Sequence, residues 1–152
     1  MKNKYHKILS LIFISLLILT GCATKDSLDD YKVKMDKFFE KMSDYDNAIN
    51  SLDPDSDSSV ADLLSYLDGI ALAVSEMSHY HVPENFYGVT ELAIQADEYM
   101  TEAVMLFRQA YQAYEYDENI AYAAKENYER ANLRLRYIAD ILRGDIPEEI
   151  FQ

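Results

Sequence analysis

Three aspartates in the first polar segment of the chain have a spacing that suits a metal ion. Asp53, Asp55 and Asp57 form a D-x-D-x-D run, which also opens the calcium loop of EF-hand sites. The rest of that pattern is missing, because Ser58 stands where glycine makes the sharp turn and Leu64 stands where a bidentate glutamate is needed. The segment is interpreted as a solvated turn, with a weak calcium site as the alternative.

A second candidate is the pair Glu76 and His79, whose i, i+3 spacing occurs in di-iron helical bundles. Such a centre needs a second pair, and the only other histidine after residue 22 is His81, which has no Glu three positions before it. Glu76 and His79 also lie off the apolar helical face, so we expect both to face water. No G-x-S-x-G nucleophile motif is present either. The sequence therefore predicts that the protein is not an enzyme and has no dissociable cofactor.

Tyrosines flank a second polar segment, around Asp117. They are Tyr111, Tyr114, Tyr116 and Tyr122. Tyrosine offers rigid, amphipathic contact area and is enriched at interfaces. At helical spacing, however, aromatic residues also form cores, and Tyr114 continues an apolar repeat. The four tyrosines and Asp117 are a candidate binding surface, with core packing of the aromatic residues as the alternative.

The only cysteine, Cys22, follows an apolar stretch from Ile8 to Leu19 that three lysines precede, at positions 2, 4 and 7. A positive start followed by a short apolar run is typical of an export signal. A membrane-spanning helix needs about 20 apolar residues, so this stretch is short for one.

The residues Leu19-Thr20-Gly21-Cys22 resemble the lipobox of bacterial lipoproteins. The resemblance implies cleavage between Gly21 and Cys22 and a diacylglycerol on the Cys22 thiol. Two acyl chains suffice for stable anchoring, since each buried CH₂ contributes about 0.8 kcal/mol. The resemblance thus implies a lipid-anchored protein on the extracytoplasmic side of the cell membrane. The rest of the chain carries no motif that indicates a family.

The charge of the chain limits its partners. Residues 1–21 hold three of the 14 basic residues and none of the 27 acidic ones, which leaves a net charge of −16 on the remainder. Such a surface is a poor partner for nucleic acid, because phosphate binding depends on Lys and Arg. Between Met42 and Phe107 there are 13 Asp and Glu and no Lys or Arg. These carboxylates either pair with basic side chains on neighbouring helices, stay solvated, or meet a cationic partner.

Apolar residues recur at alternating steps of three and four in four segments, which is the pattern of nearly parallel packed helices. The four sets are Leu28, Tyr31, Met35, Phe38, Met42, Tyr45, Ile49 and Leu52; Val60, Leu63, Leu67, Ile70, Val74 and Met77; Phe86, Val89, Ala93, Ala96, Met100, Ala103, Phe107, Ala110 and Tyr114; and Ala121, Ala124, Tyr128, Ala131, Leu135, Ile138 and Leu142. No segment shows the alternation of a strand.

Local signals predict where the helices begin and end. Ser59 and Asp62 have the spacing of a capping box for the second helix. Pro83 suits the first turn of the third helix, and Gly144 follows the last turn of the fourth. Asp117 is a suitable N-cap for a fourth helix, with a hairpin near residues 115–119.

The predicted fold is all-α, an antiparallel up-down-up-down four-helix bundle. We expect a signal peptide at residues 1–21, a lipidated linker at 22–26, the bundle at 27–144 and a tail at 145–152. Because residues 89–143 contain no Gly or Pro, the alternative is three helices with one long C-terminal helix. The predicted function is binding or protein interaction in the cell envelope, with a receptor for a small ligand or cation as the alternative.

The lipid anchor makes a direct prediction. Replacing the thiol in Cys22→Ser removes the acceptor of the diacylglycerol, so the variant should leave the membrane fraction or keep its signal peptide. Membrane fractionation with mass spectrometry of the intact chain measures both. A Cys22→Ser variant that stays in the membrane at the mature length would contradict the anchor.

Overall fold

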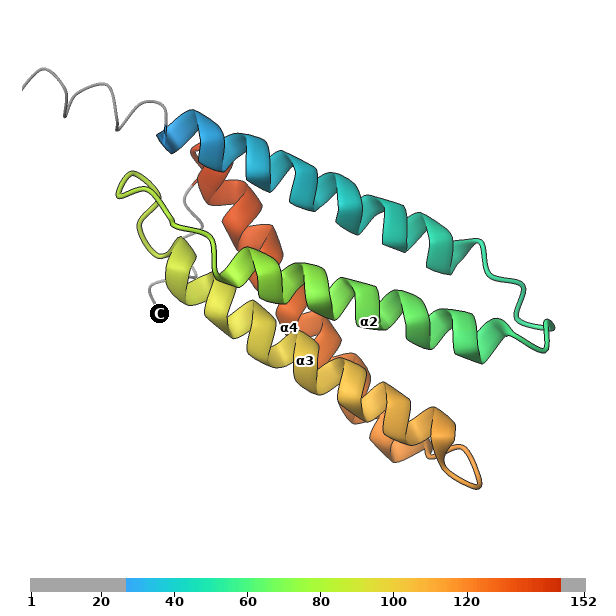
Figure 1. Ribbon diagram of the computed structural model, residues 1–152. Coiled ribbons are helices and arrows are strands. Elements are labelled where there is room, and N and C mark those ends of the chain that lie inside the picture. Colours follow the sequence, from blue (N-terminus) through green and yellow to red (C-terminus); the bar gives the residue numbers. More distant parts are fainter. Residues whose placement is uncertain (1–26, 146–152) are drawn as a thin grey trace, which may run out of the picture.

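The computed structural model describes residues 27–145, and this part of the chain forms four helices and no strand (Figure 1). The N-terminal helix is described from residue 27 to residue 50. It is followed by α2 (Ser59–Ser78), α3 (Val89–Gln112) and α4 (Glu118–Arg143). The predicted all-α four-helix bundle is confirmed. The expected signal peptide, the lipidated linker with Cys22, and most of the expected tail lie outside the described residues.

The chain reverses direction between α3 and α4, so the alternative with one long C-terminal helix is wrong. Ala113 leaves the helix with an extended backbone. Asp117 Oδ1 then accepts hydrogen bonds from the backbone N–H groups of Asn119 and Ile120, at 3.0 and 3.1 Å. These bonds satisfy amides that the first turn of α4 leaves unpaired, which confirms the predicted N-cap.

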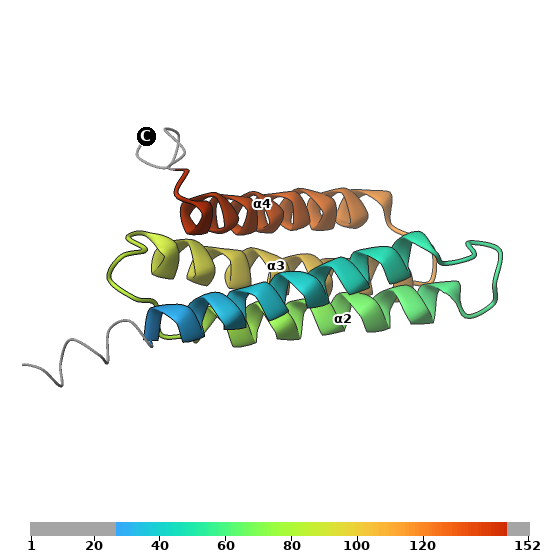
Figure 2. The same cartoon turned by 90° about the horizontal axis from the view of Figure 1, so that it is seen from above.

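The helices alternate in direction, so their connections gather at two ends (Figure 2). We call the end that holds connections 51–58 and 113–117 the distal end, because it lies away from residue 27. The end that holds residue 27 and connection 79–88 is the proximal end. None of the described helices is both long and apolar enough to cross a membrane.

Most of the core comes from residues that the three-four spacing predicts, but Val60 and Tyr114 of the repeats are exposed. Four buried residues lie beside the repeats: Leu64, Ala73, Leu92 and Val104. The largest fully buried side chains include Met35, Ile70, Met77, Met100 and Ile138. Among the described residues no polar or charged residue is buried. The core is therefore held by apolar burial, which contributes roughly 25 cal/mol per Å².

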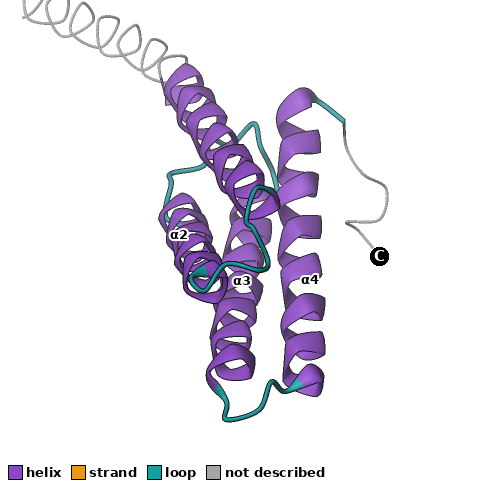
Figure 3. Cartoon of the chain, turned by 90° about the vertical axis from the view of Figure 1, so that its right-hand side faces the viewer, coloured by secondary structure: helices purple, strands orange, loops and turns teal. Residues whose placement is uncertain are grey.

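Small side chains characterise the contact between α3 and α4, which run side by side (Figure 3). The buried alanines are Ala93, Ala96, Ala103 and Ala110 on α3 and Ala121, Ala124 and Ala131 on α4. Interaxial distance depends on the side chains at the contact, so alanine lets these two helices approach closely. The bulkier Tyr31, Met35 and Phe38 of the N-terminal helix belong to the same buried cluster as Ala93, Ala96 and Ala131.

Two predicted helix starts are wrong. The N-cap of α2 is Ser58, and Ser59 is already helical, with its hydroxyl 3.4 Å from the carbonyl oxygen of Pro54. Helix α3 begins at Val89 rather than at Pro83, because Gly88 takes a left-handed backbone (φ 84°) immediately before it. At the end of α4, Gly144 has a φ of 91° and stops the helix as predicted.

Helices also pack closely where Gly69 of α2 meets Tyr45 of the N-terminal helix. A Cβ built on Gly69 would lie 2.6 Å from Cζ of Tyr45 and 2.8 Å from Cε1. Glycine inside a helix costs about 1 kcal/mol relative to alanine, and the Tyr45 ring occupies the space that this glycine leaves open.

This contact can be tested by a double-mutant cycle. In a Tyr45→Ala background, Gly69→Ala should raise the free energy of unfolding by about 1 kcal/mol. When Tyr45 is present, the same substitution should raise the free energy of unfolding by less, or should lower it. Denaturant unfolding of the four proteins measures the coupling. Equal effects of Gly69→Ala in the two backgrounds would show that the ring does not constrain the glycine.

Candidate interaction surface

Tyrosines crowd the connection between α3 and α4 at the distal end. Tyr114 is fully exposed, and Tyr116 and Tyr122 are 53% and 64% exposed. Tyr111 is half-buried, and its ring centroid lies 5.2 Å from that of Tyr116. The placement of Tyr114 on the apolar repeat is wrong, because α3 ends at Gln112 before the repeat reaches this residue.

The five predicted binding residues differ in their positions. Tyr111 and Tyr116 are in contact, and Tyr116 lines a shallow depression with Tyr122. Asp117 is used in capping α4. Burial raises the pKa of Tyr111, and the neighbouring Tyr116 raises it further. The Tyr111 hydroxyl therefore stays neutral at physiological pH. The charged residues that line the depression with Tyr116 and Tyr122 are Glu118 and Lys125.

Carboxylates dominate the charge at the distal end. Residues 44–62 contain six Asp or Glu, residues 109–124 contain three more, and neither range contains Lys or Arg. Within residues 27–145, the ion pairs join Lys41 to Glu76, Arg108 to Asp68, Lys125 to Glu129, and Arg143 to Asp140. None of the nine distal carboxylates takes part in these pairs, so pairing within the bundle does not account for them.

The acidic turn itself is held by short-range hydrogen bonds. Asp53 Oδ1 accepts from the backbone N–H of Asp55 at 3.0 Å, and Ser56 Oγ lies 3.3 Å from the backbone nitrogen of Ser58. In the part of the chain that the structure describes, no three or more His, Cys, Asp or Glu side chains are placed to hold a metal ion. Asp53, Asp55 and Asp57 thus lie in a polar turn that its own side-chain-to-backbone hydrogen bonds hold together.

The pair Glu76 and His79 is exposed to water, as the sequence predicts. Nδ1 of His79 lies 2.7 Å from the carbonyl oxygen of Ser75, and Glu76 reaches Lys41 of the N-terminal helix at 3.8 Å. Each side chain thus has its own partner.

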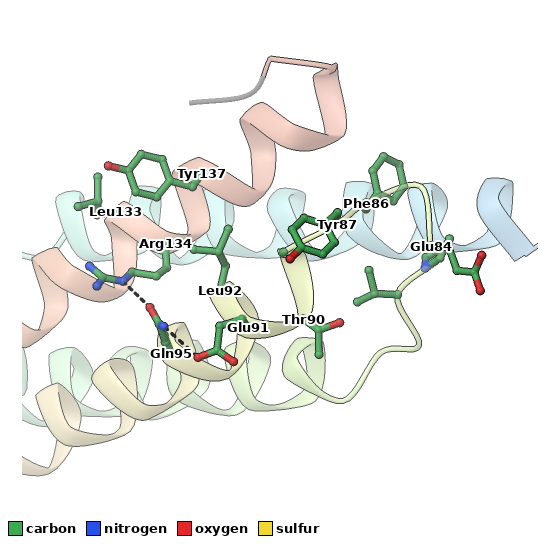
Figure 4. Close-up of a pocket in the computed structure, with 13 residues that line it drawn as sticks. Glu84, Phe86, Tyr87, Thr90, Glu91, Leu92, Gln95, Leu133, Arg134 and Tyr137 are labelled. Atoms are coloured by element: carbon green, nitrogen blue, oxygen red, sulfur yellow. Dashed lines mark hydrogen bonds between the residues drawn. The ribbon is translucent and has the colours of Figure 1, made fainter. Parts of the chain in front are cut away.

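An open groove at the proximal end has no counterpart in the sequence analysis (Figure 4). It has a volume of about 840 Å³ and lies between connection 79–88, the start of α3 and the facing side of α4. Phe86, Leu92 and Leu133 contribute apolar surface, and exposed Tyr87 lies at its edge. No motif marks the groove, because its walls come from residues about 40 positions apart.

Polar side chains form a short chain of contacts along one wall of the proximal groove. Nε of Arg134 donates to Oε1 of Gln95 at 3.2 Å, and Nε2 of Gln95 donates to Oε1 of Glu91 at 3.0 Å (Figure 4). The guanidinium of Arg134 also lies 4.9 Å from the ring centroid of Tyr99. Its orientation is fixed by these neighbours.

Comparisons with protein families, with curated proteins and with solved structures found no match to this chain.

Tyr31 links the core to the proximal end and makes alkaline stability testable. It is 3% exposed and packs against Phe86, and burial raises its pKa from 10.0 to about 12. The unfolded chain loses this proton first, so the stability contributed by the neutral hydroxyl is complete below pH 10 and is lost as pH rises toward 12.

Tyr31→Phe keeps the ring and removes the ionisable group. Its free energy of unfolding should therefore fall less than that of the unmodified protein between pH 10 and about 12. Denaturant unfolding at several pH values measures the difference. If the free energy of unfolding falls equally with pH in the two proteins, Tyr31 is not the group that titrates.

Proposed function

We propose that this protein is a non-catalytic interaction module of the cell envelope. In this proposal a diacylglycerol on Cys22 anchors the chain on the extracytoplasmic side of the membrane. The bundle then presents its distal end to a partner protein. The observation that carries the proposal is the exposure of Tyr114, Tyr116 and Tyr122 at an end of the bundle whose segments 44–62 and 109–124 contain nine carboxylates and no Lys or Arg. Lys125, at the border of the second segment, pairs with Glu129.

The distance between the two ends supports this role. Four residues separate Cys22 from residue 27, where the described part of the N-terminal helix begins. That helix runs to residue 50 and is about 36 Å long at 1.5 Å per residue. An anchor at Cys22 would thus hold the tyrosines roughly one bundle length from the lipid.

The exposed rings supply contact area of the right size. A tyrosine buries roughly 150–250 Å² when it is fully covered. Tyr114 is fully exposed, and Tyr116 and Tyr122 are 53% and 64% exposed, so the three side chains together offer roughly 330–550 Å² on this side of an interface. A standard interface buries about 800 Å² per partner. The tip is therefore suited to a modest or transient protein contact.

The proximal groove favours a second candidate, a receptor for a small ligand. Its volume of about 840 Å³ falls within the range of about 300–1,000 Å³ for ligand sites, and such sites combine apolar walls with a few fixed polar groups. Arg134 and Gln95 are such groups. A thermal-shift screen tests this candidate, because a ligand that binds only the folded state raises the melting temperature.

Site-specific photo-crosslinking in intact cells tests the interaction module. A photoreactive residue at position 114 should give a discrete crosslinked partner, because that side chain is fully exposed at the distal end. Position 87 is the matched control, since Tyr87 is 81% exposed at the proximal end. Tyr114→Ala with Tyr122→Ala should weaken capture of the same partner, whereas Tyr87→Ala should not. The same products from both positions, or none from position 114, would overturn the proposal.

A further inference from the structure

We infer that the segment of the partner that docks at the distal end is cationic and amphipathic, and that an apolar groove beside the tyrosines receives its aliphatic side chains. This inference rests on the proposed function and names the chemistry of the partner at the same end of the bundle. The apolar groove is the binding site, and the negative charge of the surrounding carboxylates decides which segments can enter it.

The distal groove has a volume of about 400 Å³ and is built by three helices and one connection. Its lining includes Ile49, Leu52 and Pro54 on the side of the N-terminal helix, Val60 and Leu63 of α2, and Tyr111 of α3. Val60 is 39% exposed, and Ile49, Leu52, Leu63 and Tyr111 are half-buried. Apolar surface is thus left in contact with water, and covering it is favourable by roughly 25 cal/mol per Å².

Tyr111 connects this groove with the tyrosine surface. Tyr111 lines the groove, and its ring centroid lies 5.2 Å from that of Tyr116. A segment that lies across the tip can therefore place one side chain in the groove and contact Tyr116 with the next. An amphipathic helix seated in a groove makes contacts of this kind.

The charge around the groove decides which segment fits. Asp53, Asp55 and Asp57 are exposed in the connection that forms one wall, and Asp62 lies between Val60 and Leu63 in the first turn of α2. No basic residue occurs in either distal range, 44–62 or 109–124. Around the apolar groove, Lys or Arg residues that flank an apolar side chain would meet carboxylates and the ring of Tyr111, both of which attract cations. The basic residue at the border of the second range, Lys125, lines the separate depression at Tyr116 and Tyr122 and pairs with Glu129. An acidic segment or an anionic lipid would be repelled.

Val60→Glu separates this inference from simple charge attraction. The substitution removes apolar lining and at the same time makes the tip more acidic. A glutamate in the first turn of α2 is favoured by the helix dipole, so the fold should persist. Val33→Glu on the N-terminal helix is the matched control, because Val33 is also exposed (51%) and lies well away from the groove.

The probe is a short, fluorescently labelled helical peptide of Leu and Lys. Its binding to the chain from residue 22 onward, carrying Cys22→Ser, is measured by fluorescence anisotropy. That chain contains the whole described bundle. Binding should weaken about tenfold in Val60→Glu, the loss expected for one aliphatic contact, and should not weaken in Val33→Glu. It should also weaken as salt rises above about 0.1 M. A peptide with Ser in place of Leu should bind weakly and should not respond to Val60→Glu.

Several results would overturn the inference. Unchanged or tighter binding in Val60→Glu would show attraction by charge alone. Equal binding of a peptide with Gln in place of Lys would show no selection for cations. A dimer in sedimentation that Val60→Glu dissociates would show that a second copy of the chain covers the groove.

If position 114 still crosslinks its partner in Val60→Glu, the groove inference fails and the proposed function stands. If position 114 gives no crosslink, the proposed function fails whatever the peptide does.

Discussion

The close approach of α3 and α4 is the packing constraint on which the rest of the structure depends. Ala96 on α3 and Ala124 on α4 are fully buried, and small side chains permit a short interaxial distance. The bulk of the core then comes from the N-terminal helix and α2, through residues such as Met35 and Ile70. The connection between the two helices, residues 113–117, is short. That connection leaves Tyr114 and Tyr116 exposed at the tip.

In the described chain the charged and amide side chains lie at or near the surface of the bundle, and Tyr31 brings an ionisable hydroxyl into the buried core. The two ends differ in what they offer. The distal end has carboxylates, tyrosines and a small apolar groove, whereas the proximal end has a larger groove in which Arg134 is fixed by Gln95 and Tyr99. A cationic partner suits the first end, and a small ligand with a polar group suits the second.

The lipid anchor and the acidic surface are complementary features of the proposed function. A domain of net charge −16 is repelled by anionic headgroups, so a covalent lipid at Cys22 would have to supply the attachment. The same repulsion would favour an upright bundle over one that lies on the membrane. Tyr111, which contacts both the distal groove and Tyr116, would then face the envelope space rather than the lipid.

Periodicity and short-range hydrogen bonding were readable from the sequence by itself. They predicted the four helices, the buried faces that carry Met35, Ile70 and Ile138, the cap at Asp117 and the stop at Gly144. The start of α3 was missed because Gly88 and the packing of Phe86 against Tyr31 override the local preference of Pro83. Only the tertiary structure decided the two grooves. Leu63 and Tyr111, or Leu92 and Leu133, become neighbours through the relative placement of whole helices, and the spacing of apolar residues within one helix does not fix that placement.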